Sequence, residues 1–139
     1  MWRNLNTGNK VDGVTYKVTK VDDNAFKNNK TVTKVTVGSN IKTIGKNAFS
    51  GATKLKTVSV GKNVTEVGAK AFKGCSSLTS VTLGSKATKI GANAFSGCKK
   101  LKTIKFTSTK LSSKAVSKNV FKGITKATTI KVPKKKLSA

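Results

Sequence analysis

The sequence contains no histidine and only four acidic residues, so most side chains that carry enzyme chemistry are missing. Without histidine, an acid–base pair would have to come from the four carboxylates, three of which lie before residue 24. Of these, Asp22 and Asp23 are expected to cap the start of the fold or to pair with lysines rather than to bind a cation. We therefore expect no enzymatic activity, no cofactor and no metal centre.

Long apolar runs are also absent. No stretch of about 18 apolar residues exists, so the sequence predicts no helix that spans a membrane. The first ten residues, MWRNLNTGNK, lack the apolar core of a signal peptide. A secreted protein that contains this segment is therefore expected to carry its signal upstream.

Charge of one sign dominates the composition. Lysine and arginine total 29 against four acids, which gives a formal net charge of +25, and Arg3 is the single arginine. Such a surface attracts polyanions and repels copies of itself. Arginine is the side chain suited to bidentate recognition of phosphates and bases, whereas lysine provides a diffuse attraction to an anionic background.

The sequence does contain a repeat of 23 residues. Phe26, Phe49, Phe72 and Phe95 follow one another at this spacing, and Phe121 comes 26 residues after the last of them. The three extra residues fall within 107–119, which we interpret as a bulged loop. A fixed period of this length is typical of a solenoid, in which each unit buries its apolar face against its neighbours.

Each unit predicts a strand, a turn, a second short strand and a helical turn. In the first strand apolar residues alternate, as at Val58 and Val60, and Gly61 then marks a turn. The second extended segment is represented by residues 64–67. A segment such as residues 92–95 is too short for a long helix, so one or two turns of 3₁₀ or α structure are expected.

The whole chain, residues 1–139, is expected to form a single solenoid of about five units. Residues 1–30 are predicted to be a degenerate N-terminal unit or cap, with a strand over 14–18. Residues 31–106 hold the regular repeats, and residues 107–139 hold a longer repeat with the insertion and a truncated C-terminal unit. A terminal unit is expected to diverge because it has only one neighbour.

The units resemble the BspA-like leucine-rich repeats of bacterial cell-surface proteins. The matching motif, I-G-x-x-A-F-x-x-C-x-x-L-x-x-V-x-L, is represented by Ile90, Gly91, Ala94, Phe95, Cys98, Leu101, Ile104 and Phe106. It recurs from Val67 and from Ile44, and the resemblance covers about residues 18–132.

The resemblance implies a right-handed leucine-rich-repeat solenoid. Parallel strands would line one face, with short second strands and 3₁₀ or helical turns on the other. It also implies a non-enzymatic adhesion or binding module, located extracellularly on a bacterial surface as a segment of a larger secreted protein.

The outward face of the predicted sheet is the first candidate site. If the apolar alternates point inward, two rows of hydroxyl and lysine side chains point outward: Lys34, Thr36, Thr57, Ser59, Ser80, Thr82, Thr103, Lys105, Thr129 and Lys131. Such rows suit hydrogen bonding to a glycan or to another protein. The alternative is that β-branched threonine simply favours an exposed strand.

The lysines are the second candidate, with electrostatic attachment to an anionic cell-wall polymer as their function. The alternative is a solvated surface that keeps the protein soluble. Nucleic-acid binding rests on the same electrostatics, but arginine clusters and interleaved aromatic residues are missing. A structural spacer, monomeric or self-associating end to end, is a third hypothesis.

Cys75 and Cys98 occupy the same position one repeat apart. That position holds Ala52 in the preceding unit and Ile124 in the following one, so it is an apolar core position. We expect two buried free thiols. A disulfide between neighbouring turns is the alternative, and it requires Cα atoms within about 7 Å.

Overall fold

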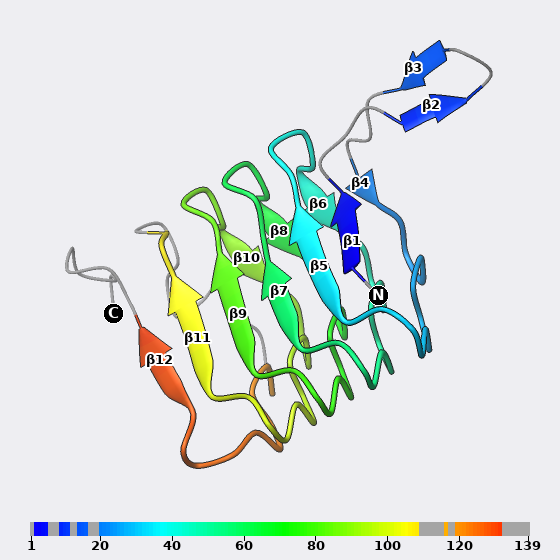
Figure 1. The fold of residues 1–139 in the computed structure, drawn as a ribbon. Coiled ribbons are helices and arrows are strands. Elements are labelled where there is room, and N and C mark those ends of the chain that lie inside the picture. The colour runs from blue at the N-terminus through cyan, green and yellow to red at the C-terminus, as the bar shows by residue number, and fades with distance from the viewer. Residues whose placement is uncertain are drawn as a thin grey trace.

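The chain winds into a β-solenoid whose successive coils contribute strands to two parallel sheets (Figure 1). The computed structural model describes residues 2–5, 9–11, 14–16, 20–108, 116 and 119–131. None of these segments forms a helix of the length and apolarity needed to cross a membrane.

The larger sheet has six parallel strands in the order β1-β5-β7-β9-β11-β12 (Figure 1). Their bounds are Trp2–Leu5, Lys34–Val37, Thr57–Ser59, Ser80–Leu83, Thr103–Phe106 and Thr129–Lys131. Val35, Val58, Val81 and Ile104 are in register and buried, so the predicted alternation is confirmed. Ile130 continues the same row on the edge strand β12 and is 46% exposed.

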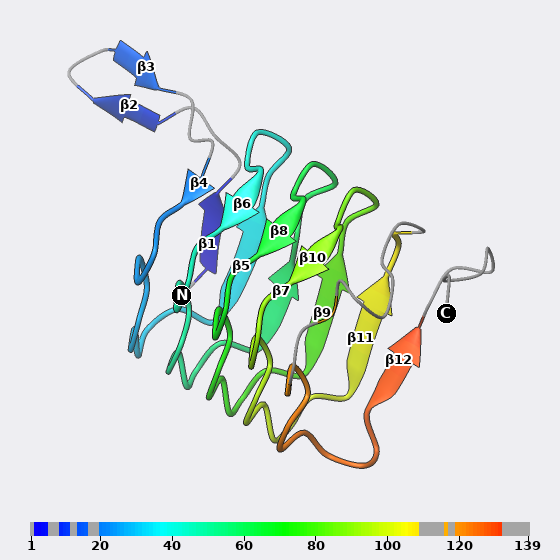
Figure 2. The same cartoon turned by 180° about the vertical axis from the view of Figure 1, so that it is seen from behind.

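In Figure 2, which shows the structure from behind, the second sheet lies in front of the larger one. It consists of four two-residue strands in the order β10-β8-β6-β4, with bounds Lys89–Ile90, Glu66–Val67, Thr43–Ile44 and Lys20–Val21. Val116 extends it through a bridge to Ile90, 26 residues earlier. The three extra residues therefore precede Val116, and most of the predicted loop over 107–119 lies outside the described residues.

The segments expected to be 3₁₀ or α turns are runs of tight turns instead, and no helix occurs in residues 20–108 or 119–131. Asn47 and Gly51 hold φ angles of 57° and 74°, and such left-handed residues interrupt a helix. Between them, N–H groups donate alternately to the next coil and within their own. The N–H of Phe49 donates to Ala71 O at 2.7 Å, and that of Ser50 to Asn47 O at 3.1 Å.

The N-terminal residues contribute strands that the repeat pattern did not predict. β1 adds to the larger sheet by pairing with β5 in parallel, with Trp2 opposite Lys34. β2 (Asn9–Val11) and β3 (Val14–Tyr16) pair antiparallel as a separate hairpin beyond the end of the stack (Figure 1). The strand predicted over 14–18 is present as β3, and residues 17–19 lie outside the described residues.

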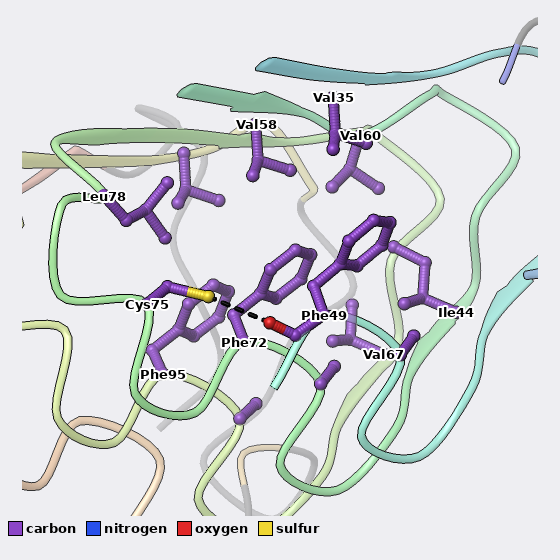
Figure 3. Packing of buried hydrophobic residues seen from close by; sticks show 14 of the residues in the cluster. Val35, Ile44, Phe49, Val58, Val60, Val67, Phe72, Cys75, Leu78 and Phe95 are labelled. Atoms are coloured by element: carbon purple, nitrogen blue, oxygen red, sulfur yellow. Dashed lines mark hydrogen bonds between the residues drawn. The ribbon is translucent and has the colours of Figure 1, made fainter. Parts of the chain in front are cut away.

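The core is a column of stacked phenylalanine rings between the two sheets (Figure 3). Neighbouring centroids lie 5.1, 5.3, 5.3 and 6.0 Å apart along Phe26, Phe49, Phe72, Phe95 and Phe121. The first three pairs are parallel within 3°. Each 23-residue coil thus places its phenylalanine directly against the previous one, which fixes the register of the stack.

The two cysteines are free and buried, as expected. The thiol of Cys75 donates to the carbonyl oxygen of Phe49 at 3.1 Å (Figure 3), and that of Cys98 to the carbonyl oxygen of Phe72 at 3.2 Å. Burial raises the pKa of Cys98 to about 12, and burial, with the neighbouring Cys98, raises the pKa of Cys75 well above its usual range. Both thiols therefore stay protonated at neutral pH and act as packing groups.

Candidate functional site

The sheet face places the ten predicted residues in two straight rows. One row is Lys34, Thr57, Ser80, Thr103 and Thr129, and the other is Thr36, Ser59, Thr82, Lys105 and Lys131. All ten side chains are exposed or half-buried. The array expected from the alternation is thus present, while ligand binding by it stays a prediction.

Strand β1 extends both rows by one register position. Trp2 pairs with Lys34, and Asn4 pairs with Thr36. These two positions were not predicted from the sequence, because Arg3 shares the register of Val35, which is an inward, apolar position in the later strands. No alternating apolar pattern therefore marks residues 2–5 as a strand.

The lysines that the structure describes are almost entirely without acidic partners. Twenty lysine side chains lie in the described part of the chain. One ion pair is formed there, between Lys89 Nζ and Glu66 Oε1 at 3.6 Å, and both side chains are about half exposed. A pair of that kind contributes at most about 1 kcal/mol, so the positive charge is directed to solvent.

Asp23, one of the two aspartates in residues 20–108, caps a neighbouring coil. Its Oδ1 accepts a hydrogen bond from the backbone N–H of Lys46 at 2.8 Å, in agreement with the expected capping role. Within the described residues there is no group of three or more Asp, Glu, His or Cys side chains that would hold a metal ion.

A shallow groove of about 390 Å³ lies on the turn segments of the stack. Its lining residues come from three consecutive coils: Lys27, Asn47, Ser50, Gly51, Lys70, Lys73 and Gly74. No carboxylate and no aromatic side chain is among them. We call this feature the turn-face groove, and it was not predicted from the sequence.

Lys70, one of the residues that line the turn-face groove, adopts an unusual backbone conformation. Its φ angle is 59°, in the left-handed region that asparagine tolerates better than lysine. The equivalent residues of the other coils are all asparagines with φ angles from 57° to 61°: Asn24, Asn47, Asn93 and Asn119. Alignment of the repeats would have shown this one exception.

The fold and the repeat define the chain as a leucine-rich-repeat β-solenoid. The family model of the BspA type leucine rich repeat region matches residues 18–138 in six copies. The chain belongs to this family, whose members are typically non-catalytic. No curated protein is similar enough to the chain to count as a match.

Solved structures of bacterial leucine-rich-repeat proteins share the fold. The T. pallidum leucine-rich repeat protein is 26% identical, with a TM-score of 0.75 over 87% of this chain and 53% of that chain. A leucine-rich cell surface protein from Faecalibacterium prausnitzii is 23% identical, with a TM-score of 0.60 over 94% of this chain and 43% of the other. The pneumococcal vaccine antigen PcpA is 18% identical, with a TM-score of 0.65 over 96% of this chain and 38% of that chain. The chain therefore spans about half the length of the T. pallidum protein and less than half the length of the other two proteins.

Proposed function

We propose that the chain is a non-enzymatic binding module of a bacterial cell-surface protein that attaches to the anionic polymer of the cell wall through its lysines. The observation that carries the proposal is the unpaired charge, since of the twenty described lysines only Lys89 meets a carboxylate. The resemblance in fold to a leucine-rich cell surface protein supports the location.

The stack makes many weak attractions act together. Phenylalanine centroids of neighbouring coils lie 5.1 to 5.3 Å apart over the first four coils, so equivalent positions recur within the screening length of about 8 Å at physiological salt. Lysines on adjacent coils therefore present one continuous field to a polymer that lies along the stack.

Nucleic acid fits this surface less well. The single arginine of the sequence lies at position 3, and the stacked phenylalanines form the core column rather than a surface platform. Readers of single-stranded nucleic acid combine a basic groove with aromatic side chains on which bases stack.

The test compares binding to purified cell walls before and after removal of their anionic polymer. We expect affinity at physiological salt to fall at least about tenfold on stripped walls, because the attraction depends on polymer charge. Protein with acetylated lysines is the control, since acetylation removes the charge. Equal binding to intact and stripped walls would contradict the proposal.

The sheet face supports a second candidate function, recognition of a glycan or protein ligand. Thr36, Ser59 and Thr82 lie in register in one row and offer a column of hydroxyl groups. A panel of immobilised glycans first identifies those that bind the unmodified protein. Joint replacement of the three residues with alanine is expected to abolish binding to these glycans, while the melting temperature changes little. Unchanged glycan binding by the triple variant would rule out this face as the site.

A further inference from the structure

We propose that the turn-face groove is a binding site for a phosphodiester group of a polyol-phosphate chain, with Lys27, Lys70 and Lys73 as its cationic side chains. This inference rests on the proposed function and gives the wall polymer a defined contact on the protein.

The groove concentrates positive charge without any internal compensation. No carboxylate lines it, and the three ammonium groups have no hydrogen-bond or ion-pair partner within the described part of the chain. Like charges around one depression repel each other, and an anion between them relieves that repulsion. The hydroxyl of Ser50 and the amide of Asn47 add uncharged donors to the same lining.

The turn-face groove lies along an alternation of residue types at equivalent positions of successive coils. One column of equivalent positions reads Lys27, Ser50, Lys73, Ser96 and Lys122. Short serine side chains therefore lie between long lysines. Since ring centroids of successive coils lie 5.1 and 5.3 Å apart, Lys27 and Lys73 belong to coils about 10 Å apart.

Lys70 provides an independent observation. All the other coils have asparagine at this left-handed position, and the exception, Lys70, belongs to one of the three coils that line the groove. Residues held in sparsely populated backbone regions gather at functional sites. The backbone conformation of Lys70 is consistent with a charge that is needed at this position.

The lining favours a polyol phosphate over a nucleic acid. Its side chains are lysine, asparagine and serine, which bind oxyanions but offer no aromatic surface on which a base could stack. A polyol-phosphate backbone has no bases to accommodate. The serine–lysine alternation continues at Ser96 between Lys73 and Lys122, so successive phosphates of one chain would meet further lysines along the same column.

The test compares two triple variants that remove the same charge. K27S, K70N and K73S replace the groove lysines with the residues found at equivalent positions of other coils. The control K42T, K54S and K62S does the same for three exposed lysines that do not line the groove. Binding is measured at physiological salt with purified poly(glycerol phosphate) and with single-stranded DNA.

We expect the groove variant to lose at least about tenfold in affinity for poly(glycerol phosphate), and the control variant less than about threefold. Equal losses would overturn the groove while leaving the proposed function intact. If the unmodified protein does not bind the polymer, the proposed function fails as well. Tighter binding to DNA than to poly(glycerol phosphate) would assign the groove to nucleic acid and overturn the inference.

The single variant K70N separates loss of the site from loss of the fold. Asparagine suits the left-handed conformation, so K70N should raise the melting temperature while it lowers affinity for the polymer. A lower melting temperature together with lower affinity would show that Lys70 has a structural role, which contradicts the inference.

Discussion

Replacement of Phe72 with alanine is expected to lower the free energy of unfolding by about 3–5 kcal/mol, measured by chemical denaturation. The ring of Phe72 is fully buried and lies 5.3 Å from both Phe49 and Phe95. Its loss would leave a cavity in the middle of the column and remove two stacking contacts. A cost of that size is a large part of the total stability of an ordinary domain.

Phe26→Ala is the matched control. Among the side chains that the structure describes, Phe26 has a ring neighbour on one side only, with its ring centroid 5.1 Å from that of Phe49, and it is half-buried. The expected loss is roughly half of that for Phe72→Ala, because less surface returns to water and less of a cavity forms. Equal losses for the two variants would contradict the stacked column as the centre of the core.

Replacement of Gly68 with valine is expected to destabilise the stack by about 3 kcal/mol. A Cβ atom at Gly68 would lie 2.7 Å from the backbone carbon of Gly45 and from the nitrogen of Lys46. Both neighbours are backbone, so they can give way only if the two coils separate. That separation would lengthen the hydrogen bond from Gly68 N–H to Ile44 O, which measures 2.8 Å. Thermal unfolding would show the loss as a lower melting temperature.

The same substitution at Asp22 is the control. Asp22 holds the equivalent position in the coil of β4, the end strand of the second sheet, and its side chain is exposed. Asp22→Val is therefore expected to change stability by less than about 0.5 kcal/mol. If Gly68→Val were tolerated equally well, the close contact between coils would not exist.

Apart from β1, the strands of both sheets followed from the sequence because the signals that predict them recur in every repeat. Alternating valines mark the larger sheet, and the residue that precedes each glycine of the Gly45, Gly68 and Gly91 series ends a strand of the second one. Strand β1 lacks such a pattern. It forms by pairing with β5, and tertiary context of this kind overrides local propensity.

The prediction of helical turns was wrong because many backbone hydrogen bonds of these segments run between coils rather than within one. A single repeat shows small residues at a spacing that fits a 3₁₀ or α turn. In the stack, Asn47 N–H donates to Ala69 O and Gly51 N–H donates to Lys73 O, both in the next coil. A pattern within one repeat contains no information about such partners.

The two candidate sites also differ in how far they could be predicted from the sequence. The rows of the sheet face follow from alternation within a strand, so Thr36 and Ser59 could be placed from the sequence. The turn-face groove depends on residues 23 or 46 positions apart, as Lys27 is from Ser50 and Lys73. A comparison of aligned repeats shows this alternation, whereas a linear count of lysines shows only the net charge.

Salt dependence of polymer binding tests the central claim most directly. The association constant for poly(glycerol phosphate) would be measured against salt concentration for the unmodified protein and for the K27S, K70N, K73S variant. Each phosphate neutralised contributes about 0.7–0.9 to the slope of log K against log salt. The proposed attachment predicts a steep negative slope that becomes shallower by about 2 to 3 in the variant. Binding that does not change with salt would contradict the attachment, and an identical slope in both proteins would contradict the turn-face groove as its contact site.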